Sequence, residues 1–277
     1  MEGEETSVSV SSERGYYVLG QVVSQVEDLI HEFKGHCSIS IHDIQNMSLP
    51  RSNSEKRTQN SVSISIAAML NTGQGGTIYL GVTDSGRVNG LPLTRYQQDH
   101  IEMSLKWTLE RYTPPVSDSR YCVIFVPVFS SKTLIPTHHV EQQLDDERRN
   151  RPHYVASSNS CWCDRDAWAQ QSLGKLPLLY VVKIHIRPWD PHNMQVARNP
   201  QAPWTPPFPP IHLTEANCCY FRQSCHQCKL CLEDVRQILM HRVQEHYRLK
   251  LTALHQQQEE LLHLMHQHGV NLPSPTQ

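Results

Sequence analysis

The sequence predicts an α/β protein, more closely an α+β domain with one mixed sheet, that ends in a long helix. Strand-like and helix-like segments follow one another over residues 15–232, no internal repeat is visible, and residues 233–268 hold one continuous helical pattern. Hydrophobic residues make up 38% of the 277-residue chain, a low fraction for a globular domain. We therefore expect one core that carries long polar insertions.

Composition narrows the class of protein. The formal net charge is −2, which excludes a polybasic nucleic-acid-binding tail but allows a local basic groove. Residues 1–14 are acidic and Ser-rich, and we expect them and residues 269–277 to be disordered. No apolar run approaches the ~20 residues of a bilayer span, and the acidic N-terminus is unlike a signal or transit peptide. The odd number of cysteines, 9, indicates reduced thiols, so we expect a cytoplasmic protein, with the nucleus as the alternative, and no membrane partner.

The first elements are a strand and a helix. Residues 38–44 alternate apolar and polar side chains, which is typical of a strand. Residues 60–71 fit both the strand and the helix period, and we favour a helix because residues 67–70 are good helix formers. The glycines at 73, 75 and 76 follow this helix and precede a strand, so they indicate a tight turn and not a nucleotide-binding loop.

The middle of the domain supplies the remaining sheet. Residues 77–82 form a clear strand, and residues 87–91 are expected to return as its hairpin partner. A helix over 94–112 begins at a threonine that is suited to capping. Residues 121–126 and 178–186 are apolar and β-branched, and they predict two further strands.

Two insertions and a terminal helix complete the chain. Residues 130–176 lie between the last two strands, and residues 188–211 are so rich in proline that regular structure is excluded there. A short strand near 219–222 precedes the helix over 233–268. That helix carries Tyr247, Leu251, Leu254, Gln258, Leu261 and Met265 at coiled-coil spacing. Pairing with a second chain and packing on the helix's own domain both fit this pattern.

Two blocks of sequence resemble a known family. The first is Glu27-x-x-x-x-Glu32-Phe-Lys34, and the second runs from Ala67-Ala-Met-Leu-Asn-Thr72 through Gly75-Gly-Thr-Ile-Tyr-Leu-Gly-Val-Thr-Asp84 to Gly90. Over about 20–125 they resemble the Schlafen AlbA_2 domain, and the chain is similar to the short Schlafen-like proteins. The second block is the more specific, because its glycines, Asn and Asp agree in order with the family pattern.

The resemblance implies a metal site. Several Schlafen-family proteins are endoribonucleases that act on tRNA, rRNA or small-RNA precursors, with two Glu and one Asp holding a divalent cation. In this chain those residues would be Glu27, Glu32 and Asp84, and the cation Mg²⁺ or Mn²⁺. The spacing of the two glutamates requires a turn between them, with Glu27 before a strand and Glu32 on it. The alternative is three unrelated surface carboxylates.

The chain also departs from the family pattern. Thr83 stands where the family often has the first of two acidic residues, and the segment 45–59 lengthens the gap between the two blocks. If that first acidic position is the metal ligand, the chain has lost it. The zinc-binding His/Cys set of the longer Schlafens is not matched.

The chain as a whole carries little net charge, so RNA phosphates would have to bind a local group of lysines and arginines near the acidic residues. The candidates for RNA contact are Lys34, Lys56, Arg57, Lys106 and Arg222. Each of them, taken alone, also fits a solvated surface charge.

The cysteines near the C-terminal helix suggest a second metal. Cys225, Cys228 and Cys231 are spaced for Zn²⁺, and a fourth ligand would come from the pair at 218 and 219 or from the pair at 161 and 163. Reduced thiols without a metal are the alternative.

Three classes of function remain open. The first is a metal-dependent endoribonuclease for structured RNA, such as tRNA or a small-RNA precursor. The second is a non-catalytic RNA- or DNA-binding subunit, or a pseudo-nuclease, of a heteromeric RNA-processing complex. The third is a structural interaction protein. In the longer Schlafen nucleases two such lobes form a groove, so a single lobe would require a homo- or hetero-oligomeric Schlafen-like partner.

Overall fold

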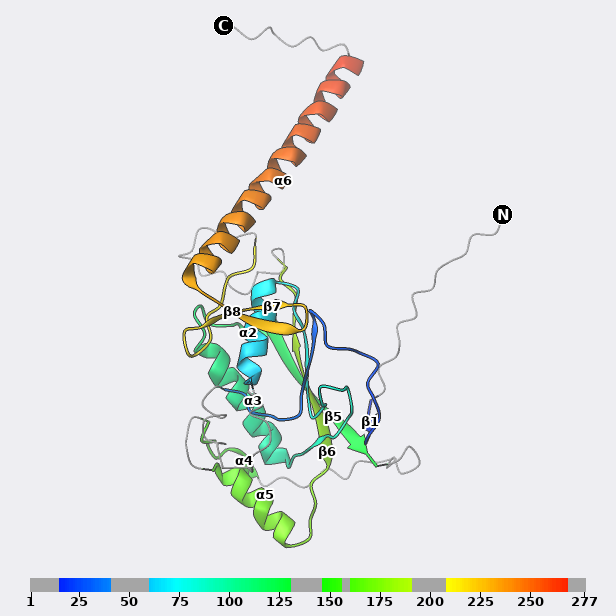
Figure 1. Cartoon of the computed structure of the whole chain (residues 1–277), viewed down its shortest axis with the longest axis vertical. Coiled ribbons are helices and arrows are strands. Elements are labelled where there is room, and N and C mark those ends of the chain that lie inside the picture. Colours follow the sequence, from blue (N-terminus) through cyan, green and yellow to red (C-terminus); the bar gives the residue numbers. More distant parts are fainter. Residues whose placement is uncertain (1–14, 41–59, 131–145, 156–159, 191–207, 269–277) are drawn as a thin grey trace, which may run out of the picture. The chain divides into compact units, whose positions relative to one another are not determined.

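The computed structural model describes residues 15–40, 60–130, 146–155, 160–190 and 208–268 and confirms the mixed α/β fold (Figure 1). These residues divide into two compact units, one with the sheet and its helices and one with the C-terminal helix α6, Leu232–Gln267. No helix among the described residues combines the length and apolarity that crossing a bilayer requires.

The sheet has 6 strands, and β6 (Leu179–Ile186) lies at its centre. β6 pairs antiparallel with β5 (Tyr121–Phe129), β3 (Gly76–Leu80) and the short β4 (Leu91–Pro92). The two outer strands run parallel to their neighbours: β1 (Tyr17–Val18) to β5, and β2 (His31–Lys34) to β3. β2 is therefore an edge strand, and one side of its backbone is open to other groups.

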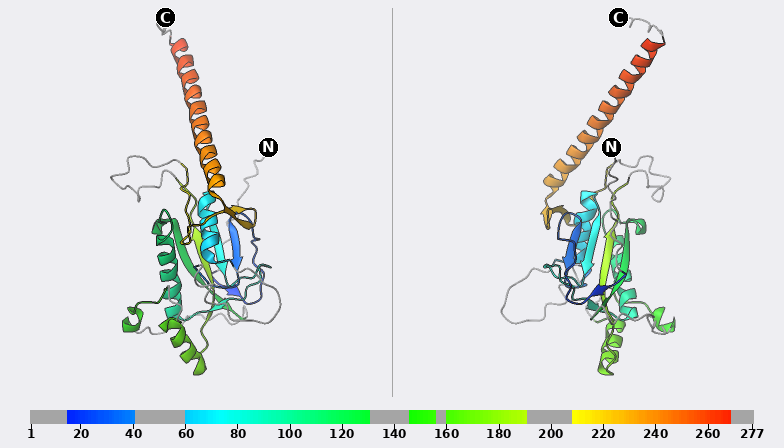
Figure 2. Two further views of the ribbon diagram at one scale, coloured as in Figure 1. Left: turned by 60° about the vertical axis from the view of Figure 1, so that its left-hand side comes forward. Right: turned by 90° about the vertical axis from the view of Figure 1, so that its right-hand side faces the viewer.

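Helices α2 and α3 cover one face of the sheet (Figure 2). α2 runs over Val62–Thr72, and every residue from Val62 to Asn71 is buried. A helix that is buried on all sides needs no polar face. This explains why the sequence of α2 fits the period of a strand as well as that of a helix. α3 (Arg95–Glu110) is amphipathic and begins with the expected cap, because Thr94 and Gln97 exchange side-chain to backbone hydrogen bonds.

The opposite face of the sheet carries a smaller apolar cluster that includes Phe33, Tyr79 and Val181. Lys183 lies on this face with its ammonium 5.5 Å from the ring centre of Tyr17 and 5.7 Å from that of Tyr79. Lys183 is only 7% exposed, and at these distances its ammonium can interact with the faces of both rings.

A hairpin of β7 (Cys219–Gln223) and β8 (His226–Leu230) forms a separate 2-stranded sheet, and β7 packs against α2. Asn71 joins α2 to this region. Its amide donates to the backbone oxygens of His212 and Tyr220, at 2.9 Å each, and its oxygen accepts from the backbone nitrogen of His212 at 2.7 Å.

The insertion between β5 and β6 contains α4 (Asp146–Arg149) and α5 (Trp162–Ser172). Its apolar contacts form a third, small cluster in which Trp162 and two cysteines meet Tyr96 of α3. Among the described residues, the apolar contacts between the insertion and α3 therefore involve few side chains.

Two sequence predictions differ from the structure. Residues 38–40 are not in a strand, because the backbone oxygens of Ser38 and Ile39 accept hydrogen bonds from the first two residues of α2; residues 41–44 lie outside the described residues. The expected hairpin return over 87–91 is reduced to one bridge between Val82 and Val88, after which the chain joins β6 as β4. The central part of the proline-rich loop, 191–207, also lies outside the described residues.

Candidate metal and nucleic-acid site

The carboxylates singled out in the sequence lie around the β2–β3 edge. Glu27 precedes β2, Glu32 lies on it, and Asp84 follows β3 in an exposed turn. The side chain of Glu27 runs back along the open edge of β2, where its Oε1 accepts a hydrogen bond from the backbone nitrogen of Phe33 at 2.9 Å. The turn expected between the two glutamates is present, and it includes Asp28, whose side chain accepts from the backbone nitrogens of Ile30 and His31.

The charges of these carboxylates affect one another. Burial raises the pKa of Glu27, and the negative charges of Glu32 and Asp84 raise it further against the opposing effect of the Phe33 hydrogen bond. A carboxylate such as Glu27, whose pKa is raised by acidic neighbours, would be stabilised in its charged form by a cation beside it. The carboxylate oxygens of Glu27, Glu32 and Asp84 do not all lie within 4.8 Å of one another. In the described part of the chain, only a group of histidines and cysteines is gathered that closely.

Glu32 already has cationic partners. Its Oε1 accepts from the Lys34 ammonium at 2.6 Å and from Gln227 at 2.7 Å, and its Oε2 accepts from Arg222 at 2.5 Å. Ser65 of α2 donates to it at 3.3 Å. Burial alone would raise the pKa of Glu32, but Lys34 and Arg222 outweigh that effect and hold the pKa below its usual value. The carboxylate is therefore ionised and rigidly oriented.

Arg222 has a different position from the one expected for a phosphate contact. Its side chain is completely buried. Its guanidinium donates to Glu32 and to the backbone oxygens of Asp28, at 2.5 Å, and His31, at 2.6 Å. Arg222 thus holds the turn before β2 and orients Glu32, and it presents no side-chain surface to a ligand.

The other candidate RNA contacts are divided between described and undescribed residues. The Lys34 side chain is 13% exposed beside Glu32. Lys106 lies exposed on α3, with Asp118 at 3.2 Å and Glu110 at 4.0 Å from its ammonium. Lys56 and Arg57 lie outside the described residues.

His36 belongs to the same region, although sequence reasoning missed it. Burial, followed by the charge of Lys34, lowers the pKa of His36 against the opposing effects of a backbone hydrogen bond at Asn60 and of the Asp84 charge, which favours the neutral ring. Its Nδ1 is positioned to accept from the backbone nitrogen of Ser38 at 3.1 Å. In that arrangement the proton of the neutral ring lies on Nε2. No sequence motif marks this histidine.

The three cysteines predicted to bind zinc are not gathered in one group. Cys225 lies in the turn between β7 and β8 with its sulfur 3.7 Å from the His226 ring, and Cys228 lies on β8 and donates to Gln223. Cys231 begins the approach to α6, and its backbone nitrogen donates to Asp234. In an extended strand, residues three positions apart are separated by about 10 Å. The prediction of a zinc site assumed a turn at these cysteines, and β8 is extended instead.

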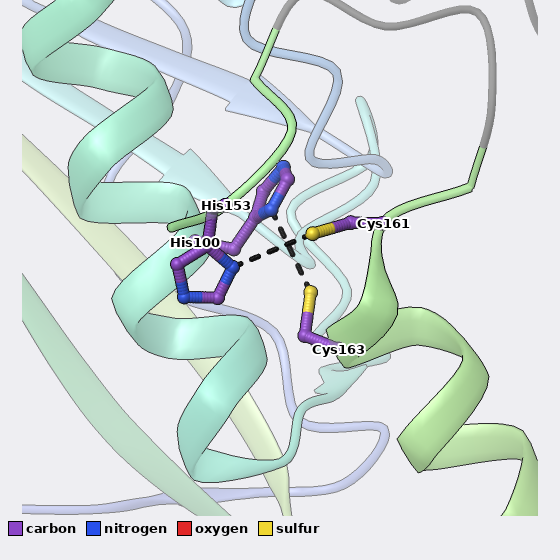
Figure 3. A group of neighbouring side chains, drawn as sticks. All are labelled: His100, His153, Cys161 and Cys163. Atoms are coloured by element: carbon purple, nitrogen blue, oxygen red, sulfur yellow. Dashed lines mark hydrogen bonds between the residues drawn. The ribbon is translucent and has the colours of Figure 1, made fainter. Parts of the chain in front are cut away.

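A different group of side chains has the geometry of a metal site. Ligand atoms of His100, His153, Cys161 and Cys163 all lie within 4.8 Å of one another, and this is the one such group among the described residues (Figure 3). The sequence signal for it was weak. The two cysteines are separated by one residue, but His100 lies 63 positions before Cys163 and on another helix.

A comparison with protein families places these observations in context. The family model described as Schlafen, AlbA_2 matches residues 27–196, which is more than half of the chain. The match includes all three carboxylates and all four members of the His/Cys group. A function connected with nucleic acids is what this similarity suggests.

Proposed function

Because the chain belongs to the Schlafen AlbA_2 family, we propose that it is a divalent-metal-dependent endoribonuclease for structured RNA, such as tRNA or a small-RNA precursor. The observation that carries the proposal is the electrostatic coupling of Glu27 with Glu32 and Asp84. Glu32 and Asp84 lie close enough to Glu27 for their negative charges to raise its pKa, which indicates that the three carboxylates share one region of the surface.

The donor set suits Mg²⁺ or Mn²⁺, because both prefer carboxylate oxygens. Bound there, such a cation would supply an activated water and neutralise charge on the phosphodiester. Glu27, Glu32 and Asp84 would hold it. Glu27 is kept along the edge of β2 by the Phe33 backbone, and Glu32 is oriented by Arg222, so two of the three ligands are preorganised by the fold.

Lys34 is the described residue best suited to bind an RNA phosphate at this site. Its ammonium neutralises Glu32 at 2.6 Å, and its long flexible stem allows it to turn toward a phosphate when a cation takes its place. Lys56 and Arg57, in the segment before α2, would extend the basic surface, and Lys106 on α3 would add a more distant contact.

The experiment is cleavage of a labelled tRNA and of a single-stranded RNA in Mg²⁺ or Mn²⁺. We expect Glu32→Gln and Asp84→Asn each to lower the rate at least about 100-fold, as is common for loss of a metal ligand or an electrostatic group. Glu102→Gln is the matched control, because Glu102 is an exposed carboxylate on α3. Chelator should abolish cleavage and Mg²⁺ alone should restore it.

The second candidate is a non-catalytic RNA- or DNA-binding subunit of a processing complex. Thr83 favours it, because its hydroxyl is used within the turn, where it contacts Ser85 at 2.9 Å and accepts from the backbone nitrogen of Arg87 at 3.2 Å. The cationic partners of Glu32 favour it too. Wild-type protein that binds RNA without cleaving it in either metal, and with a Kd unchanged by Glu32→Gln, would support this reading over the nuclease.

A partner chain is part of the proposal. Longer Schlafen nucleases use two lobes, and this chain matches the family once, so a second Schlafen-like chain would complete a groove for RNA. α6 offers the means, because its residues at coiled-coil spacing fall within one continuous helix. Measurement of the mass in solution with and without Leu251→Glu/Leu254→Glu tests this. A mass that already corresponds to one chain in the wild type would contradict it.

A further inference from the structure

We propose that His100, His153, Cys161 and Cys163 bind one Zn²⁺ in a closed structural site that fastens the insertion between β5 and β6 to α3 (Figure 3). This site is separate from the carboxylates of the proposed nuclease, and its occupancy does not depend on that activity. Two histidines and two cysteines are an established set of zinc ligands.

The distances between ligand atoms fit a single ion. The Cys161 sulfur lies 3.5 Å from Nδ1 of His153, and the Cys163 sulfur lies 3.6 Å from Nδ1 of His100. Tetrahedral zinc, with bonds of about 2.3 Å to sulfur and about 2.05 Å to nitrogen, places sulfur and nitrogen ligands about 3.6 Å apart. In both pairs, the distance between sulfur and nitrogen therefore matches the distance between two ligands of one tetrahedral zinc ion.

Hydrogen bonding within the pairs does not account for the arrangement. One thiol and one imidazole at this distance could simply share a proton. Here two such pairs converge, and the four ligand atoms all lie within 4.8 Å of one another. Bringing four buried or half-buried polar groups together costs desolvation energy, which an ion held by all four would offset.

The surroundings suit metal-bound thiolates. Cys161 is the N-cap of α5 and Cys163 lies in its first turn, where the helix dipole favours negative charge. Burial and the negative charge of Asp164 act against it and raise the pKa of the Cys163 thiol, so a thiolate there requires a bound cation. The backbone nitrogen of Tyr154 donates to the Cys161 sulfur at 3.4 Å. Cys163 is fully buried and Cys161 is 2% exposed, so solvent and other ligands are kept away from the sulfurs. On binding, the two thiols would release their protons to solvent.

The site is closed, which indicates a structural metal. Catalytic zinc keeps one position for water, whereas four protein ligands fill a tetrahedron. A cluster of two iron atoms would spread its cysteine and histidine ligands over two metals, which does not fit sulfur and nitrogen at one tetrahedral edge. The donor set also excludes Mg²⁺, which prefers oxygen.

The location explains what the metal would do. His100 comes from α3, and the other three ligands come from the insertion, whose apolar cluster is small. The described part of the insertion also has polar contacts with α3, such as the hydrogen bond from Gln97 to Asp164 at 2.9 Å and the ion pair of Arg149 with Asp99 at 3.3 Å. A metal contributes folding energy where a segment cannot bury enough apolar surface.

The test is the metal content of the full chain, purified in reductant from cells grown with added zinc. We expect one zinc per chain in the wild type and a loss of at least tenfold in Cys161→Ser/Cys163→Ser. The matched control is Cys225→Ser/Cys228→Ser, which removes the cysteines that sequence spacing favoured and should keep its zinc. Zinc that stays in the first variant and leaves the second would overturn the proposal.

A measurement on the wild type covers the case in which the first variant fails to fold. X-ray absorption should show two sulfur and two nitrogen ligands, and Co²⁺ in place of zinc should show the intense visible bands of a tetrahedral site. A zinc chelator should lower the Tm by about 5 °C or more and expose residues 160–174 to protease. A metal-free wild type, a copper or iron content in place of zinc, or a disulfide between Cys161 and Cys163 would each disprove it.

Discussion

Arg222 and Glu32 form a buried ion pair that joins β7 to β2, with the guanidinium Nη1 2.5 Å from the carboxylate Oε2. The two side chains are 0% and 4% exposed and lie 190 positions apart in the sequence. The pair connects the C-terminal hairpin of the domain to the strand that carries a proposed metal ligand. Its integrity therefore affects both stability and the geometry of the site.

Loss of one partner of this pair should be costly. Arg222→Met leaves the Glu32 charge buried with Lys34 as its remaining cation, and we expect the free energy of unfolding to fall by about 3 kcal/mol or more. Urea denaturation measures this. The double variant Arg222→Met/Glu32→Met removes the unpaired charge and should recover part of the loss. A double variant that is less stable than the single one would contradict this account.

Glu32 should also make the fold sensitive to acid. Its pKa lies below the usual value, so the unfolded chain binds this proton more tightly than the folded chain. The stability that Glu32 contributes is present above the pKa of the unfolded state and is lost as the pH falls through the pKa of the folded state. Glu32→Gln should destabilise the protein at pH 7 and flatten the acid limb of stability against pH. An unchanged acid limb would argue against the ion pairs.

Glu27 should have the opposite effect on how stability depends on pH. Its pKa is raised by burial and by its acidic neighbours, so the stability associated with it is lost as the pH rises through that pKa. Glu27→Gln keeps the acceptor for the Phe33 backbone and removes the repelled charge. It should therefore raise the Tm at pH 7 while lowering any metal-dependent cleavage, a common trade-off at functional sites. A lower Tm would show that the three carboxylates do not repel one another.

Gly75 should tolerate no side chain. It has φ 69° and lies in the turn from α2 to β3, where a Cβ atom would collide with the backbone oxygen of Ile186 and with the backbone of residues 187 and 188. Gly75→Ala should destabilise the fold by about 2 kcal/mol or more, as measured by urea denaturation. Gly35→Ala is the control, because nothing lies within 4 Å of the position of its added Cβ. Equal effects at the two positions would refute the steric explanation.

Lys34 should contribute to RNA binding through charge. We expect Lys34→Gln to weaken binding and to reduce the slope of log K against log salt concentration by about 0.7, the value for one phosphate contact in a single strand. Lys106→Gln tests the contact on α3 in the same titration. An unchanged slope for Lys34→Gln would mean that this lysine serves only to neutralise Glu32.

Local sequence predicted much of the fold. The cap at Thr94, the helix that follows it and the two long strands β5 and β6 were predictable because each depends on neighbours in sequence. The resemblance implied that Glu27 and Glu32 meet at one site, and their spacing then placed Glu27 before a strand and Glu32 on it. Residues 38–40 were mistaken for the start of a strand because their alternating pattern serves the start of α2 instead.

The sequence by itself therefore indicated most of the long strands and helices and the family, and the resemblance to that family singled out the three candidate carboxylates. Tertiary structure decided which groups meet those carboxylates and where a metal would be held by sulfur. Arg222 reaches Glu32, and His100 reaches Cys163, only because the fold brings distant segments together. Spacing along the chain reports geometry within one helix, strand or turn, and it carries no information about side chains that converge from separate elements. For that reason the cysteines with the clearest spacing, Cys225 and Cys228, are not members of the converging group.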